Sequence, residues 1–201
     1  MNEEADKNLF WYRVKLVAVV LVFLSPFVGG WLAVYVFEWR PPSGNYGELV
    51  QPVRKVDWPA VASLEGVELE TGIGRKWAFL LFANDGCAEQ CRENVYYMRQ
   101  IKILLGRNSN RLQNLLVSSQ SVSEDLREFL QDYPRFLVIE SNRSAELFQQ
   151  FQLDGLDPVG NTPRMYLVDP DRNFMMYFPP QSDEYKVLDD LKKLMKLSQI
   201  G

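Results

Sequence analysis

Two cysteines are the residues with the clearest capacity for chemistry in this sequence. Cys87 and Cys91 are the only cysteines among the 201 residues, and three residues separate them. Residues four apart on a helix are neighbours on one face. A disulfide between them is feasible, since it needs a Cα–Cα distance of about 4.4–6.8 Å. The spacing therefore predicts a dithiol that undergoes redox chemistry or binds a metal.

The two thiols should have different roles. Cys87 is predicted to lie at a helix start, where free backbone N–H groups and the helix dipole stabilise a thiolate. Cys91 heads the apolar stripe of that helix and should be sheltered. We therefore expect Cys87 to attack and Cys91 to resolve the mixed disulfide. Asp85 and Glu89 oppose a thiolate and Arg92 favours it, so their net electrostatic effect stays open.

The composition limits the other possibilities. The chain has no histidine, the commonest transition-metal ligand and general base. Two thiolates alone suit Cu(I), so Cys87 and Cys91 are also the candidate metal ligands, and the pattern requires no cofactor. The alternative of a structural disulfide is disfavoured because so short a loop stabilises little. The 22 Lys and Arg residues are scattered, which argues against nucleic acid as a partner.

A strand and a helix should position the cysteines. Residues 77–83 form a continuous apolar run, typical of a central strand that is covered on both faces. Residues 88–105 should form an amphipathic helix. Its apolar side chains recur at spacings of three and four and are Cys91, Val95, Met98, Ile101 and Leu105.

The remaining elements predict an α/β fold. Strands are expected over residues 112–118, 136–139, 165–168 and 174–178, and helices over residues 122–131, 145–151 and 183–197. Ser121 or Ser123 should cap the helix at 122–131. Alternating strands and helices indicate parallel pairing, and the late hairpin adds an antiparallel edge. We expect a thioredoxin-like mixed sheet flanked by helices.

Pro163 is the third candidate site residue. The tripeptide Asn161-Thr162-Pro163 directly precedes the strand predicted at 165–168. In thioredoxin-like folds a proline with a cis peptide bond faces the cysteine pair from this place, and such bonds usually mark a particular position. The alternative is an ordinary trans proline at the start of a strand.

A hydrophobic run precedes the domain. From Leu16 to Phe37 no residue is charged. As a helix this run would span about 33 Å, enough for the hydrocarbon core of a membrane. It is too long for a signal-peptide core and lacks a cleavage site, so we predict an uncleaved transmembrane helix. Aromatic residues that suit the two interfaces flank it, namely Trp11, Tyr12, Tyr35 and Trp39.

Basic residues predict the orientation. Lys7, Arg13 and Lys15 precede the run, and only Arg40 follows closely. The positive-inside rule places the N-terminus in the cytoplasm and the domain in the periplasm, where disulfides form. We therefore expect a single-pass inner-membrane protein. Its parts would be a cytoplasmic tail (1–15), a transmembrane helix (16–37), a linker (38–66) and a thioredoxin-like domain (67–201).

At these residues the chain resembles the SCO/SenC family of membrane-anchored, thioredoxin-like cytochrome oxidase assembly proteins. The likeness rests on the N-terminal helix, on Cys87-x-x-x-Cys91 after an apolar strand, and on the sequence YLVDP at residues 166–170. It is stronger for a divergent bacterial branch, through residues 45–52 and 190–201. The resemblance implies a role in oxidase assembly. The implied partner is a cytochrome oxidase subunit or another thiol protein.

The chain also departs from the family pattern. Copper-binding members carry a histidine shortly before YLxDP, and by register Asn161 occupies that position. The residues flanking Cys87 differ too, and Arg92 replaces the usual proline after Cys91. We expect Asn161 to lie near the two sulfurs. Three functions stay open, which are thiol–disulfide exchange, a Cu(I) metallochaperone for the oxidase copper site, and a non-catalytic assembly scaffold.

Overall fold

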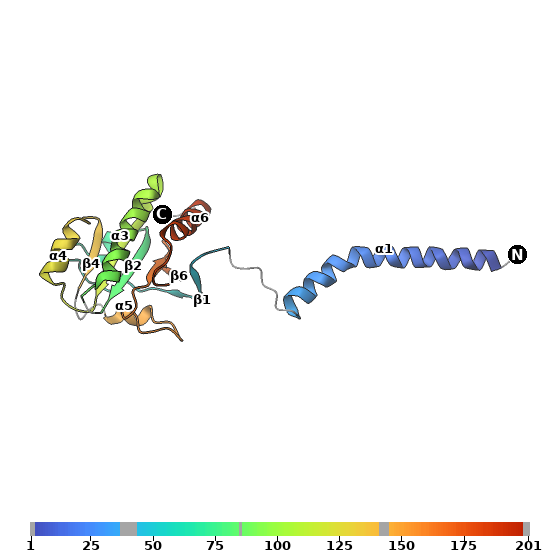
Figure 1. The fold of residues 1–201 in the computed structure, drawn as a ribbon, viewed down its shortest axis with the longest axis horizontal. Coiled ribbons are helices and arrows are strands. Elements are labelled where there is room, and N and C mark those ends of the chain that lie inside the picture. The colour runs from blue at the N-terminus through green and yellow to red at the C-terminus, as the bar shows by residue number, and fades with distance from the viewer. Residues whose placement is uncertain (1–2, 37–43, 85, 141–144, 199–201) are drawn as a thin grey trace. The chain divides into compact units, whose positions relative to one another are not determined.

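The computed structural model describes residues 3–36, 44–84, 86–140 and 145–198. The chain forms two compact units, Met1–Gly44 and Asn45–Gly201. The first contains helix α1 (Glu3–Tyr35) (Figure 1). Its segment Phe10–Tyr35 is long and apolar enough to cross a membrane, and its side chains are mostly exposed. The predicted transmembrane run agrees with this helix, although its last residue, Phe37, lies outside the described residues.

The second unit is built on a six-stranded sheet, and the sheet is mixed, as the sequence predicted. The strands are β1 (Glu48–Lys55), β2 (Trp77–Ala83), β3 (Leu112–Ser118), β4 (Phe136–Ile139), β5 (Met165–Val168) and β6 (Asn173–Phe178). Their order across the sheet is β1-β6-β5-β2-β3-β4. β2, β3 and β4 run parallel, whereas β5, β6 and β1 pair antiparallel. The central position of β2 explains why all seven of its residues are buried.

Helices cover both faces of this sheet (Figure 1). They are α2 (Leu69–Ile73), α3 (Glu89–Leu104), α4 (Glu124–Gln131), α5 (Ala145–Gln150) and α6 (Glu184–Leu197), with a short 3-10 helix, η1 (Gly106–Arg111). Ser123 is the residue that caps α4, since its Oγ accepts a hydrogen bond from the N–H of Leu126. Asp183 caps α6 in the same way. A side-chain oxygen at this place satisfies N–H groups that have no partner within the helix.

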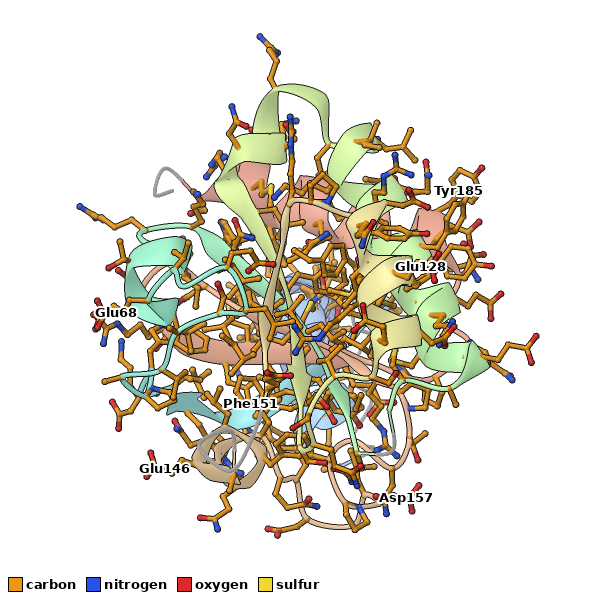
Figure 2. The ribbon with its side chains drawn as sticks, turned by 90° about the vertical axis from the view of Figure 1, so that its left-hand side faces the viewer. Glu68, Glu128, Glu146, Phe151, Asp157 and Tyr185 are labelled. Carbon is orange, nitrogen blue, oxygen red and sulfur yellow. A yellow bond between two sulfur atoms is a disulfide. The ribbon has the colours of Figure 1, made fainter. Side chains whose placement is uncertain are left out.

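The side chains of β2 alternate between two hydrophobic cores. Phe79 and Leu81 point to the face that α3, α4 and α6 cover. Leu80 and Phe82 point to the opposite face, which α2 and α5 cover. This alternation follows from the two-residue period of a strand. Charged residues such as Glu68 and Asp157 lie at the periphery (Figure 2).

Strand β1 was missed by the sequence analysis, which assigned residues 48–55 to a linker. The strand pairs with β6 at the edge of the sheet, and its register is irregular between Leu49 and Arg54. Val50 is its only buried residue, so the two-residue hydrophobic period that marks a half-buried strand is absent. Pro52 also argues against a central strand, but an edge strand tolerates proline.

Candidate functional site at the disulfide

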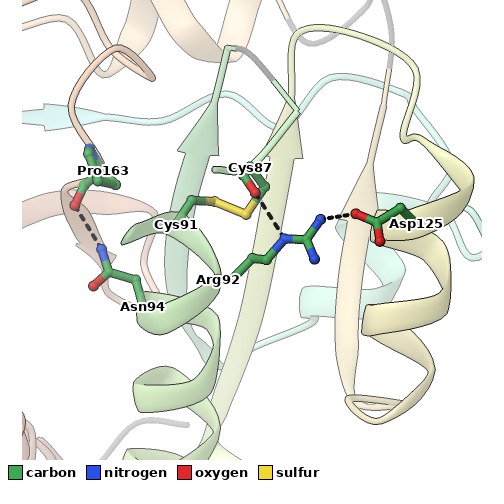
Figure 3. The surroundings of a disulfide bond; sticks show 6 residues. All are labelled: Cys87, Cys91, Arg92, Asn94, Asp125 and Pro163. Carbon is green, nitrogen blue, oxygen red and sulfur yellow. Dashed lines mark hydrogen bonds and ion pairs between the residues drawn. A yellow bond between two sulfur atoms is a disulfide. The ribbon is translucent and has the colours of Figure 1, made fainter. Parts of the chain in front are cut away.

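Cys87 and Cys91 form a disulfide at the end of β2 and the start of α3 (Figure 3). The Cα–Cα distance is 5.0 Å, within the range of about 4.4–6.8 Å that a disulfide requires. Both residues are buried, with exposed fractions of 2% for Cys87 and 5% for Cys91. Cys91 is sheltered, as predicted. Cys87, the predicted attacking thiol, is buried as well in this oxidised state.

The backbone explains why Cys87 is buried. Gly86 and Cys87 both have positive φ angles, 74° and 59°, and Ala88 then caps α3 with an extended backbone. Cys87 therefore lies outside the helix, and its chain turns back over the helix end. Glycine adopts a positive φ without cost, but for other residues this conformation costs roughly 1–2 kcal/mol.

A small cavity of about 150 Å³ adjoins the disulfide. Its lining includes Cys87, Cys91, Asn161 and Pro163. The fold thus brings the cysteine pair together with the loop before β5, some 70 residues away along the chain. The prediction that Asn161 lies near the sulfurs agrees with this arrangement.

Pro163 contacts the helix of the cysteines without the expected cis bond. Among the described residues the one cis peptide bond joins Gln51 to Pro52, so the expected cis bond before Pro163 is absent. The N–H of Arg164 donates to the carbonyl of Thr162 at 2.8 Å, which closes a tight turn around the proline. Nδ2 of the buried Asn94 of α3 donates to the Pro163 carbonyl, also at 2.8 Å (Figure 3).

Asn84 is a site residue that the sequence analysis did not identify. Its Nδ2 donates to Oδ1 of Asn161 at 2.6 Å and to the carbonyl of Val159 at 3.1 Å. Its own carbonyl accepts a hydrogen bond from Oγ of Ser119 at 2.9 Å. Asn84 therefore joins the end of β2 to the loop before β5 through its side chain, and to the end of β3 through its backbone carbonyl. The available signal was that Asn84 is the first polar residue after the apolar run.

Gly160 allows this loop to approach Asn84 closely. Its φ is +89°, and a Cβ there would lie 2.8 Å from Cγ of Asn84 and 2.7 Å from Cε1 of Phe148. Replacing Gly160 with alanine should therefore destabilise the domain by about 1–3 kcal/mol, through overpacking and backbone strain. Thermal or chemical unfolding of the full chain in detergent measures this loss.

Gly155 provides a matched control for that substitution. It has a similar φ, +79°, but a Cβ there would meet no atom within 4 Å. Gly155→Ala therefore isolates the cost of backbone strain. Equal losses of stability in the two variants would contradict the packing of Gly160 against Asn84.

Arg92 connects the cysteine loop to α4. Its Nε donates to the carbonyl of Cys87 at 3.3 Å, and its guanidinium pairs with Asp125 (Figure 3). The same guanidinium lies 5.3 Å from the centre of the Phe129 ring, a cation–π distance. Asp125 thus offsets part of the positive charge that we expected to favour a Cys87 thiolate. Asp85, which should oppose it, lies outside the described residues.

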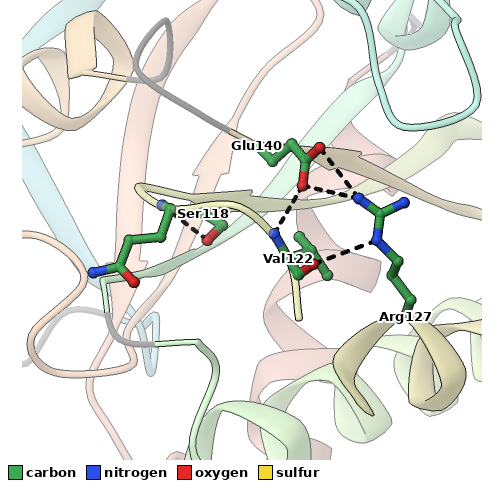
Figure 4. A network of polar contacts seen from close by, with 5 residues as sticks. Ser118, Val122, Arg127 and Glu140 are labelled. Atoms are coloured by element: carbon green, nitrogen blue, oxygen red, sulfur yellow. Dashed lines mark hydrogen bonds and ion pairs between the residues drawn. The ribbon is translucent and has the colours of Figure 1, made fainter. Parts of the chain in front are cut away.

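A second polar network holds the loop between β3 and α4 (Figure 4). Oε2 of Glu140, after β4, accepts a hydrogen bond from the N–H of Val122 at 2.8 Å. Arg127 of α4 pairs with the same carboxylate at 3.3 Å and donates through Nε to the Val122 carbonyl. The network fixes the start of α4, and therefore the position of the Asp125 that Arg92 contacts.

The donor set limits which metal could bind. No group of three or more His, Cys, Asp and Glu side chains gathers within the described part of the chain. After reduction of the disulfide, the two sulfurs could hold a soft ion such as Cu(I). Asn161 would present an amide, which is a poor ligand for copper in either state. The residues present therefore fit Cu(I) and not Cu(II).

Comparison with known proteins was made at the levels of family, sequence and structure. Residues 77–198 match the model of the family described as transmembrane-like, thioredoxin-like, C-terminal domain. The chain belongs to this family. The matched part of this transmembrane-like, thioredoxin-like protein includes Cys87, Cys91 and Pro163. No curated protein matches the chain by sequence.

Solved structures of Sco proteins share the fold. Copper-bound ScoI from Arabidopsis thaliana superposes with a TM-score of 0.55 at 15% identity, covering 76% of this chain and 99% of that one. Apo Sco1 from Thermus thermophilus gives 0.56 at 19% identity, covering 79% and 100%. BsSco, a Sco-family cytochrome c oxidase assembly protein described with a disulfide switch, gives 0.51 at 16%, covering 75% and 100%. The predicted thioredoxin-like fold and the SCO/SenC likeness are confirmed at the level of the fold.

Proposed function

We propose that this protein assists cytochrome oxidase assembly by thiol–disulfide exchange through Cys87 and Cys91. The observation that supports the proposal is the disulfide at the β2–α3 junction, which lines a cavity together with Asn161 and Pro163. A purely structural disulfide would not need an adjoining cavity that a partner's sulfur can enter. The fold that the chain shares with BsSco supports the same process.

The exchange begins from the reduced pair. The Cys87 thiolate attacks one sulfur of a disulfide in the partner, forms a mixed disulfide and expels the partner's other sulfur as a thiolate. The Cys91 thiolate then attacks Sγ of Cys87 and releases the partner's second sulfur. This two-electron exchange reduces the partner's disulfide to a dithiol and oxidises the two cysteines to the Cys87–Cys91 disulfide. A dithiol reductant must restore the reduced pair.

The local structure supports this division of roles. Cys91 belongs to α3 and packs in the hydrophobic core, so its position depends on the helix. Cys87 lies outside the helix with a strained, left-handed backbone. Breaking the disulfide removes the bond that ties this loop to the helix. Cys87 is then free to relax toward solvent, where a partner can reach it.

Replacing Cys91 with serine should stop the reaction at the mixed disulfide. The reduced full-length variant, in a neutral detergent, would be mixed with a peptide that contains an internal disulfide. We expect mass spectrometry to find the peptide joined to Cys87. The amount of adduct formed by Cys87→Ser should be at least about tenfold lower, because its remaining thiol, Cys91, is in the core. If both variants formed equal adducts, or neither formed any, the proposed roles would be wrong.

Cu(I) delivery is the second candidate function. It is favoured by the fold shared with copper-bound ScoI and by the two sulfurs that reduction would free. An anaerobic titration of the reduced protein should then give one Cu(I) per chain, and Cys87→Ser and Cys91→Ser should each abolish it. A reduced protein that binds no Cu(I) would exclude this function. A double serine variant that left oxidase assembly unchanged would instead indicate a scaffold.

The proposed setting is the cell inner membrane. Residues 1–15 would lie in the cytoplasm, residues 16–37 would cross the membrane, and the thioredoxin-like domain would lie in the periplasm. The apolar segment Phe10–Tyr35 supports the membrane span, and Lys7, Arg13 and Lys15, which precede residue 16, support this orientation. Protease added to the periplasmic side of spheroplasts should digest the domain. Protection of the domain would reverse the proposed orientation.

A further inference from the structure

A second cavity, of about 330 Å³, has no lining residue in common with the disulfide cavity. Arg99, Lys102 and Ile103 line it from the C-terminal half of α3, and Asn114 lines it from β3. Residues 132–136, which join α4 to β4, complete the lining. The cysteines lie at the opposite end of α3, so this cavity is remote from the thiol chemistry.

The cavity is rich in unpaired positive charge. Arg99, Lys102 and Arg135 line it, and Asp132 is the only acidic residue of its lining. An adjoining hollow, whose lining also includes Glu65, adds Lys76. None of these four cations forms an ion pair with any described residue, whereas Arg92, Arg127, Arg164 and Arg172 all do.

The environment of Lys102 shows that this charge is unfavourable when it has no counterion. Burial, followed by the charges of Lys76 and Arg135, lowers the pKa of Lys102 to about 8. Each factor acts against the protonated side chain. A bound anion would offset both the repulsion between these cations and the cost of removing Lys102 from water.

Asn114 contributes a second, independent feature. Its side chain is almost fully buried, at 1% exposed. Nδ2 donates to the carbonyl of Met98 at 3.0 Å, which fixes the orientation of the amide. Oδ1 then has no hydrogen-bond partner among the described residues and almost no accessible surface, so a ligand in the cavity reaches it only when neighbouring side chains shift. Because an unpaired buried acceptor costs about 1–3 kcal/mol, a ligand with an N–H or O–H donor would be stabilised here.

The rest of the lining is apolar and aromatic. Ile103, Pro134 and Phe136 contribute apolar surface, and the Arg99 guanidinium lies 5.5 Å from the centre of the Tyr133 ring. The volume is in the range of small-ligand sites, roughly 300–1,000 Å³. The ligand should therefore combine an anionic group, a nearby hydrogen-bond donor and a small apolar body.

We propose that this cavity binds an N-acylated amino acid with a free carboxylate, either as the C-terminal residue of a polypeptide or as a small molecule. The carboxylate contacts Lys102 and Arg135, the amide N–H faces Oδ1 of Asn114, and the apolar side chain packs against Tyr133 and Phe136. The phosphate group of a phosphomonoester dianion would satisfy the cations but would bring no donor for Asn114. The site requires neither cysteine and therefore goes beyond the proposed function.

Calorimetric titration of the full-length protein in a neutral detergent tests this site, with N-acetyl-L-leucine as the probe. We expect saturable 1:1 binding. N-acetyl-L-leucinamide, which lacks the negative charge, should bind about tenfold more weakly, as should the N-methylated acid, which lacks the N–H. Lys102→Gln and Arg135→Gln should weaken the binding of N-acetyl-L-leucine by a similar factor. Lys192→Gln, which removes an exposed cation of α6, should leave binding unchanged.

The outcomes separate the alternatives. A tetrapeptide ending in leucine that binds at least as tightly as the probe indicates a polypeptide C-terminus, and one that fails to bind indicates the small molecule. Equal binding of acid and amide would overturn the site. The site would also be overturned if Lys192→Gln weakened the binding of N-acetyl-L-leucine as strongly as Lys102→Gln does. The absence of binding by both the probe and the tetrapeptide would overturn it as well.

Discussion

Replacing Asp190 with alanine should produce the largest loss of stability among the single substitutions considered for this domain. Asp190 lies on α6 and is 2% exposed. Its Oδ2 accepts hydrogen bonds from the N–H groups of Tyr46 at 2.7 Å and Gly47 at 2.8 Å. Its other oxygen lies 3.7 Å from Nζ of Lys193. One carboxylate thus anchors the segment that enters β1.

The alanine variant would leave two N–H groups without their partner. Each unsatisfied donor costs about 1–3 kcal/mol when it is buried, so we expect a total loss of about 3 kcal/mol. Denaturation of the full chain, followed by tryptophan fluorescence, measures the loss. Asp189→Ala is the matched control, since Asp189 is exposed on the same helix. It should change stability by less than about 0.5 kcal/mol. Similar losses in the two variants would show that the contact is unimportant.

Replacing Asn161 with histidine should strengthen copper binding by the reduced protein, above all for Cu(II). Asn161 lines the same small cavity as both cysteines. An imidazole there would add the borderline nitrogen ligand that Cu(II) prefers and that two thiolates lack. Once one ring nitrogen binds copper, the other carries the proton and cannot accept the hydrogen bond that Asn84 now donates to Asn161, but Asn84 keeps its bond to the carbonyl of Val159. The fold should therefore be preserved.

The expected gain is at least about tenfold in affinity, equivalent to about 1.4 kcal/mol. Competition with a chromophoric chelator under anaerobic conditions measures it. Asn161→Gln serves as the control, because it changes the size of the side chain but keeps the amide. If the histidine and glutamine variants bound Cu(II) equally, position 161 could not serve as a metal-ligand position.

The sequence by itself determined the central sheet and the chemical pair. The predicted ranges of β2, β3, β4 and β5 coincide with those in the structure. The continuous apolar run of β2 suits a strand that is covered on both faces, so local pattern and tertiary environment agree there. The cysteine spacing also predicted a neighbouring pair, and the pair forms a disulfide although Cys87 lies outside the helix.

The tertiary structure alone decided the details that depend on residues distant in the sequence. β1 forms by pairing with β6, and its weak hydrophobic pattern does not predict a strand. Cys87 is buried because Gly86 and Cys87 turn the chain back over α3. The cationic cavity joins side chains of α3, β3 and the loop before β4, and no local period connects them. Local periodicity reports which face of an element is buried, whereas a site depends on which faces meet.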